Sequence, residues 1–331
     1  MATPFFEDIL QQPTVLRDLI HAYRSGEGHD RLQALQRPTR ILLSGMGASY
    51  HAALYGALLF TGRGIAAVAV EATDLLNFNG LLLDTFDTLI FISQSGASGE
   101  ILPLVERIAP TTTLIAITNH ADSPLARAAG HTLLQYAGTE TTVATRTYVN
   151  TLACLWTLAQ HWDAADPFDP LARLADSAQA LVETREALIT AWFDTLHDRE
   201  EIMFLGHGPH LATARQGAMM LAEWAKYAAL YFGIGAFRHG FIEIVTPRTG
   251  AIVFGAGGRT STSTRGLISE LEGYGARTLT ISSGRIGGDP ADDFLTPLLD
   301  VIPAQFFAEF MAQHRQIEPG FRYIQKVVRR L

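Results

Sequence analysis

The sequence predicts an α/β fold made of two doubly wound parallel sheets with helices on both faces. Three observations support this: short apolar runs that end in glycine, amphipathic stretches between the runs, and a second series of the same elements. Strands that are apolar along their whole length and alternate with helices are typical of a parallel sheet covered on both faces. The length of 331 residues also favours two domains over one.

The expected elements follow one another in the same order in both halves of the chain. In the first half we expect a helix at residues 7–23 and strands at 41–45, 66–70, 88–92, 113–118 and 131–136. In the second half we expect long helices at 143–161 and 171–195, strands at 202–206, 252–255 and 278–282, and a helix starting near Leu211.

These elements give a domain division. We expect an N-terminal helix in residues 1–30, a first domain in 31–165, a linker helix in 166–196, and a second domain with a C-terminal tail in 197–331.

Composition excludes several classes of function. The 25 basic and 33 acidic residues give a net charge of −8, which argues against nucleic acid or an anionic membrane surface as partner. Cys154 is the only cysteine, so an intrachain disulfide and a multi-cysteine zinc site are excluded. The chain starts without a signal-peptide pattern and contains no apolar stretch of about 20 residues, so we expect a cytoplasmic protein with no membrane partner.

A cluster of small polar residues follows the apolar run 88–92, and we call residues 93–98 the phosphate loop. Ligands of open parallel sheets bind beyond the carboxyl ends of strands, and hydroxyls and amides at a strand–helix junction suit a phosphate. The candidate phosphate-binding residues are Ser93, Gln94, Ser95 and Ser98, with Ser49 in the equivalent place after the first strand. The alternative is that Ser98 is only a helix N-cap and Gly96 only a turn.

Residues 89–96, Leu-Ile-Phe-Ile-Ser-Gln-Ser-Gly, resemble the phosphosugar loop of the sugar isomerase (SIS) family. The resemblance continues along the chain at residues 8–13, 143–147, 216–223 and 237–240 and at Lys326. The chain is similar to the isomerase half of glucosamine-6-phosphate synthase and to stand-alone phosphosugar isomerases and deaminases. The resemblance therefore implies two flavodoxin-like SIS domains.

The resemblance also implies roles for individual residues. Val143 and Thr145 would line the sugar, and the phosphate loop would hold its phosphate. Glu223 would be the base that moves a proton between C1 and C2, and His239 would open the sugar ring from across a dimer interface. Lys326 would form an imine with a ketose carbonyl. These residue types fit the chemistry, because such a base is a carboxylate shielded from water, and an apolar helix face (Met219, Met220, Trp224, Tyr227) surrounds Glu223 in sequence.

Three departures from the family pattern bear on the reaction. Gln216 and Met220 stand where the synthase has a glutamate and a lysine, and Ala48 replaces a threonine. We also expect no glutaminase domain. We therefore expect a homodimeric phosphosugar isomerase or a deaminase/deglycase acting on a 6-phosphorylated, amino-substituted hexose, without metal or cofactor. The alternative is a non-catalytic, phosphosugar-binding regulator, while the missing Gly-x-Gly-x-x-Gly pattern disfavours an NAD enzyme.

Two motifs of the second half have no role in the expected reaction. His207-Gly208-Pro209-His210 has no carboxylate at ligand spacing, so we expect no metal there. Residues 255–264 read either as a second anion loop or as a capping segment, and we favour the capping segment.

Overall fold

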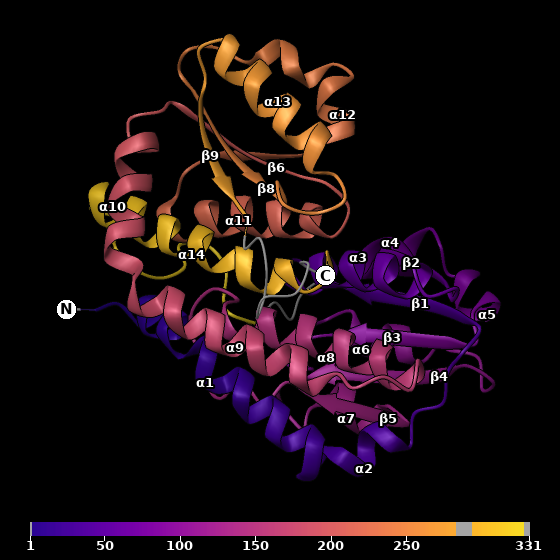
Figure 1. The fold of residues 1–331 in the computed structure, drawn as a ribbon. Coiled ribbons are helices and arrows are strands. Elements are labelled where there is room, and N and C mark those ends of the chain that lie inside the picture. The colour runs from indigo at the N-terminus through magenta and orange to yellow at the C-terminus, as the bar shows by residue number, and fades with distance from the viewer. Residues whose placement is uncertain (1, 283–292, 328–331) are drawn as a thin grey trace. The chain divides into compact units, whose positions relative to one another are not determined.

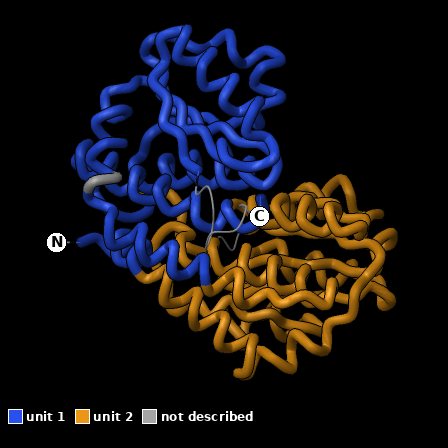
Figure 2. The backbone as a smooth tube through the Cα atoms, in the orientation of Figure 1, with its two compact units in different colours: residues 1–10, 173–321 blue, residues 11–172, 322–331 orange. Residues whose placement is uncertain are grey.

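Two parallel β-sheets, one in each of two compact units, organise the chain (Figures 1 and 2). They are seen in a computed structural model, which describes residues 2–282 and 293–327 apart from the side chains of residues 187 and 188. Unit 1 contains residues 1–10 and 173–321, and unit 2 contains residues 11–172 and 322–331. The predicted fold class is confirmed. The domain boundaries expected from the sequence stay a prediction.

The sheet of unit 2 has five parallel strands in the order β2-β1-β3-β4-β5. The strands are β1 (Arg40–Gly45), β2 (Ala66–Glu71), β3 (Thr88–Ile92), β4 (Thr113–Thr118) and β5 (His131–Leu134). All five residues of β3 are buried, which explains its continuous apolar run. The strand order reverses between β1 and β3, and a crevice at such a point is the usual ligand site of this architecture.

Helices cover both faces of this sheet (Figure 1). They are α2 (Gly28–Gln33), α3 (Ala48–Thr61), α4 (Ala72–Asn77), α5 (Leu82–Thr85), α6 (Ile101–Val105), α7 (Pro124–Ala128) and α8 (Arg146–Trp162), and α1 (Pro4–Ser25) begins in unit 1. On one face α3 lies between β1 and α8, where a Cβ on Gly56 would come within 2.7 Å of Leu43. On the other face α4 and α6 bury an apolar cluster with β1 and β3.

The sheet of unit 1 has four parallel strands in the order β7-β6-β8-β9. The strands are β6 (Glu201–Gly206), β7 (Ala229–Gly233), β8 (Thr249–Phe254) and β9 (Arg277–Ile281). The helices are α9 (Phe168–Glu183), α10 (Arg185–Leu196), α11 (Pro209–Ala225), α12 (Ile234–Arg238), α13 (Ser261–Gly273) and α14 (Thr296–His314), with a 3₁₀ turn at Phe241–Ile244. Helix α11 packs on β6, β7 and α14, and the opposite face is covered by α12 and α13.

Among the elements that differ from the sequence prediction are β7 and two of the long helices. β7 was not expected, because Leu230 and Tyr231 at its centre are exposed and the strand lacks a buried apolar run. The single helix expected at 171–195 is two helices that meet at Thr184. The helix expected at 143–161 starts only at Arg146, where the Glu140 side chain accepts the N–H groups of Thr145 and Thr147.

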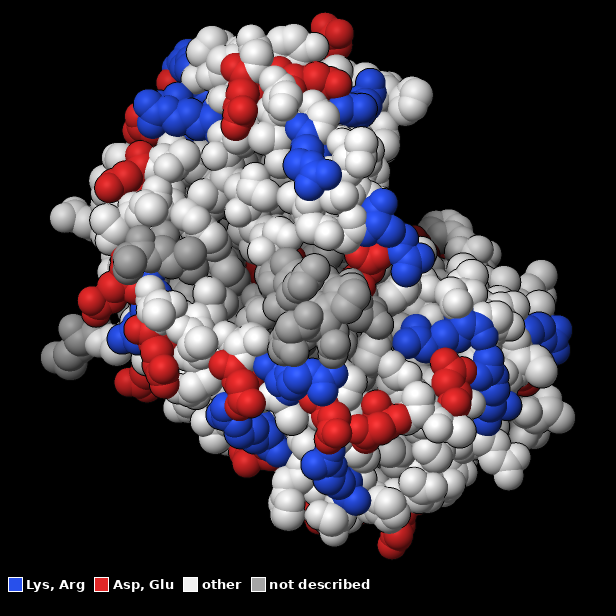
Figure 3. Space-filling model, in the orientation of Figure 1, with Lys and Arg blue, Asp and Glu red and all other residues white. Residues whose placement is uncertain are grey.

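The surface carries charges of both signs. Figure 3 shows acidic and basic side chains interspersed over the face that it draws. No helix within the described part of the chain is long and apolar enough to cross a bilayer.

Candidate active site

The phosphate loop lies directly after β3, at the carboxyl end of the sheet of unit 2. The backbone N–H of Ser93 still donates to the carbonyl of Ile117 at the end of β4, at 3.0 Å. Ser49 lies in the first turn of α3, just after β1, which pairs with β3. Because parallel strands end at the same edge of a sheet, Ser49 and the phosphate loop lie at the same edge, where the strand order reverses between β1 and β3.

A left-handed glycine gives the phosphate loop its shape. Gly96 has a φ of +59°, and a Cβ at this position would lie 2.1 Å from Ser123 Oγ. Its N–H donates to Ser93 Oγ at 3.2 Å, and its carbonyl accepts from Leu125 N–H at 3.0 Å. The loop is therefore held against the start of α7, and only glycine fits there without strain.

The hydroxyls of the loop make contacts within the loop. Ser98 Oγ lies 3.5 Å from Ser93 Oγ, and Ser95 Oγ accepts from the N–H of Ala97 at 3.2 Å. Ser98 is not at the N-cap position of α6, which is held by Glu100 without a hydrogen bond from its side chain to the helix. The side chains of Gln94, Ser95 and Ser98 are only partly buried, so they remain accessible to a ligand.

Val143 and Thr145 lie in the segment before α8, and both side chains are buried. Thr145 Oγ1 donates to the carbonyl of Val143 at 2.9 Å. The segment is held by Glu140, whose Oε1 accepts the N–H groups of Thr145 at 3.0 Å and Thr147 at 3.2 Å. Its Oε2 accepts the hydroxyl of Thr147 at 2.6 Å. This carboxylate satisfies N–H groups at the start of α8, which is why the helix begins later than expected.

The C-terminal lysine is bound to the same carboxylate. Lys326 Nζ donates to Glu140 Oε2 at 3.0 Å and to the carbonyl oxygen of Thr142. The Glu140 side chain is fully buried, whereas that of Lys326 is 23% exposed. Phosphate loop, sugar-lining segment and lysine thus all belong to unit 2. Sequence reasoning missed Glu140, although an acid just before an expected helix start is a signal that could have drawn notice.

Glu223 and His239 belong to unit 1. Glu223 lies near the end of α11 and is half-buried, while its neighbours Met220 and Trp224 are buried. Trp224 Nε1 donates to Glu309 Oε2 at 2.6 Å, so the indole faces α14. His239 follows α12 and is exposed.

The two positions of α11 that depart from the family pattern lie inside unit 1. Gln216 and Met220 are both fully buried. Met220, which replaces the lysine of the family pattern, is therefore a residue of the core of unit 1.

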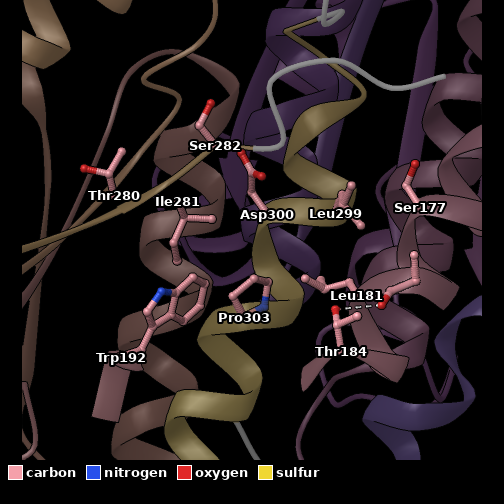
Figure 4. A pocket seen from close by; sticks show the side chains of 11 residues that line it. Ser177, Leu181, Thr184, Trp192, Thr280, Ile281, Ser282, Leu299, Asp300 and Pro303 are labelled. Carbon is pink, nitrogen blue, oxygen red and sulfur yellow. Dashed lines mark hydrogen bonds between the residues drawn. The ribbon is translucent and has the colours of Figure 1, made fainter. Parts of the chain in front are cut away.

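Two cavities of unit 1 are lined by residues outside the phosphate loop. One has about 460 Å³ and lies between α9, α10, β9 and α14 (Figure 4). Its polar lining includes Ser177, Ser282 and Asp300. The smaller has about 110 Å³ and lies at His207, His210 and Arg259. In the ranges that the structure describes, no three His, Cys, Asp or Glu side chains form a cluster that could hold a metal ion.

Comparisons with known proteins identify relatives of the chain. The model of the SIS domain matches residues 34–160 and 195–285, and the predicted resemblance is confirmed. Glutamine–fructose-6-phosphate aminotransferase (isomerizing) of Shouchella clausii is 31% identical over 334 residues, which cover 93% of this chain and 55% of that protein. The chain thus spans about half the length of this relative.

Solved structures show the same fold. Glucosamine-6-phosphate deaminase from Thermotoga maritima superposes with a TM-score of 0.83 at 20% identity, covering 98% of this chain and 99% of the other. Tagatose-6-phosphate ketose/aldose isomerase from Escherichia coli superposes with a TM-score of 0.79 at 23% identity, covering 94% and 93%.

Proposed function

Because the chain belongs to the SIS domain family, we propose that it is an enzyme acting on a 6-phosphorylated, amino-substituted hexose by moving a proton between C1 and C2. The reaction is then that of an isomerase or of a deaminase/deglycase. Ser49, Ser93, Gln94, Ser95 and Ser98 bind the phosphate in this proposal. Val143 and Thr145 line the sugar, and the active site lies at the interface of a homodimer.

One observation favours catalysis over binding alone: Lys326 is held by a buried carboxylate in the unit that carries the phosphate loop. A protein that only recognises a phosphosugar gains little from an ammonium group at this place. For an enzyme the pair is useful, because Glu140 can take a proton from the ammonium of Lys326. The neutral amine can then attack the ketose carbonyl, and the imine forms with loss of water.

Glu223 is the base of the proposed reaction, and His239 opens the sugar ring. Glu223 is half-buried beside Met220 and Trp224, which gives it part of the shielding that a carboxylate base needs. The structural relatives include a deaminase and a ketose/aldose isomerase, and proton transfer next to a carbonyl is the step that these two reactions share.

Deuterium exchange tests the proposal. Purified protein is incubated in deuterated water with fructose 6-phosphate or glucosamine 6-phosphate, and label at C1 and C2 is followed by mass spectrometry. We expect exchange in the wild type and in Glu186→Gln, which removes an exposed carboxylate of α10. In Glu223→Gln we expect a loss of about 10²-fold or more.

Two results would contradict the proposal. Tight binding of either sugar phosphate without any exchange would favour the alternative, a phosphosugar-binding regulator. Undiminished exchange in Glu223→Gln would show that another group is the base.

A further inference from the structure

Unit 1 repeats the backbone geometry that surrounds Ser49 and the phosphate loop in unit 2. Gly47, before α3, has φ 53° and ψ −123°, and Gly208, before α11, has φ 50° and ψ −121°. Each helix follows the first strand of its sheet, and each strand lies where the strand order reverses. Counting from these glycines, His210 has the place of Ser49.

The second loop of the crevice is repeated too. Gly255 N–H donates to the carbonyl of Ile281 on β9 at 3.1 Å, as Ser93 N–H donates to Ile117 at 3.0 Å in unit 2. Gly255 therefore has the place of Ser93, and counting onward gives Thr260 the place of Ser98. Between these loops lies the cavity of about 110 Å³, whose lining includes His207, His210, Arg259, Thr260 and Asp293. The sheet of unit 1 therefore has a cavity at the place where such folds bind ligands.

A buried histidine supplies this cavity with a polar group. His210 is only 5% exposed, and its Nε2 lies 2.9 Å from Asp300 Oδ2. Because the carboxylate of Asp300 accepts the hydrogen of Nε2, Nδ1 is left for another partner. Nδ1 faces Gly255, where a Cβ would come within 2.8 Å, and it has no hydrogen-bond partner among the described residues.

The carboxylate of Asp293 lies at the edge of the cavity, beside Gly258 and Arg259. Asp293 Oδ2 accepts Arg259 Nε at 2.5 Å, and its Oδ1 accepts the backbone N–H of Arg259 at 3.3 Å. A Cβ on Gly258 would lie 1.9 Å from Asp293 Oδ1, so the glycine makes room for this oxygen. An oxyanion bound by a backbone N–H and a guanidinium is the arrangement that proteins use for phosphate.

We propose that this cavity is a second anion site, which takes a phosphate group, and that the Asp293 carboxylate occupies part of it in the unliganded chain. The ligand is inorganic phosphate or the phosphate of a monoester. It would exchange with Asp293 at Arg259 and lie against His210 Nδ1. The proposal is independent of the proposed function, because it uses residues of unit 1 that the proposed reaction does not.

Phosphate binding to Asp293→Ala tests this site. Inorganic phosphate is titrated by calorimetry into variants that also carry Ser95→Ala, which weakens the phosphate loop. Asp198→Ala is the matched control, because it removes one exposed negative charge from the same unit. We expect Asp293→Ala to bind phosphate about tenfold more tightly than the control, since a like charge has left the site. Adding Arg259→Ala, which removes an exposed side chain, should abolish this gain in phosphate affinity.

Histidine resonances separate this site from the phosphate loop. In Asp293→Ala labelled at histidine Cε1, phosphate should shift the His210 signal. This signal reports on the cavity of unit 1 even if Ser95→Ala does not prevent phosphate from binding at the phosphate loop. Asp293→Asn provides a variant of the same shape should the alanine variant not fold. An unmoved His210 signal, or equal phosphate affinity in Asp293→Ala and Asp198→Ala, would overturn the proposal.

Discussion

The ammonium of Lys326 lies 3.0 Å from the buried carboxylate of Glu140. The two residues are 186 positions apart, and the same carboxylate also binds Thr145 and Thr147 at the start of α8. The ion pair thus joins the C-terminal tail to the segment that carries Val143. Substitution of Glu140 should cost more stability than substitution of Lys326, because Glu140 makes more hydrogen bonds.

We expect Glu140→Gln to destabilise the protein more than Lys326→Met. The amide cannot accept from all the donors that Glu140 serves, and the loss should be about 2–4 kcal/mol. The lysine is partly exposed, and its loss should cost about 1 kcal/mol. Urea unfolding measures both variants, and the double variant gives their coupling. A larger effect of Lys326→Met would contradict this account of the pair.

Gly96→Ala should disrupt the phosphate loop. The new methyl group would meet Ser123 Oγ at 2.1 Å on a backbone with φ +59°, so we expect a loss of stability of at least about 2 kcal/mol and weaker phosphosugar binding. Gly130→Ala is the control in the same unit, because nothing lies closer than 4.0 Å to its Cβ. Melting curves with and without glucosamine 6-phosphate report both effects. Equal behaviour of the two variants would show that Gly96 is not needed for the loop.

Cys154 should resist thiol reagents in the folded protein. Burial raises the pKa of this thiol to about 12, so almost no thiolate exists at pH 8. In the unfolded chain the pKa is near 8.5, and the folded state therefore loses this thiol's share of stability as the pH rises from about 8.5 to about 12. Labelling by iodoacetamide should be slow in buffer and fast in urea. Rapid labelling of the native protein at pH 8 would refute this.

The pKa of His207 should rise when Arg238 is removed. Burial lowers this pKa first, and the positive charge of Arg238 lowers it further. Arg238→Ala removes only the second effect, so the pKa moves up toward its ordinary value. The exposed Arg248, which pairs with Glu200, provides a control substitution to alanine. A titration of histidine signals by NMR measures the change, and equal shifts in both variants would contradict a specific effect of Arg238.

Much of the candidate site in unit 2 could be predicted from the sequence, because local signals are strong there. The loop after β3 is marked by a buried apolar strand followed by small polar residues, and the structure has β3 at Thr88–Ile92, as expected. Ser49 could be placed beside it because parallel strands end at one edge. The partners of Glu140 could not be assigned, since its donors come from a later turn and from the far end of the chain.

The sequence by itself determined the α/β class and two parallel sheets, because the period of apolar residues reports which elements are buried. Only the tertiary structure decided which partner each polar group has. It brought Asp293 to Arg259 and Asp300 to His210 across long stretches of chain, and it showed β7, whose exposed residues carry no apolar signal. Such pairings depend on how buried polar groups satisfy one another in three dimensions, and no local pattern encodes that.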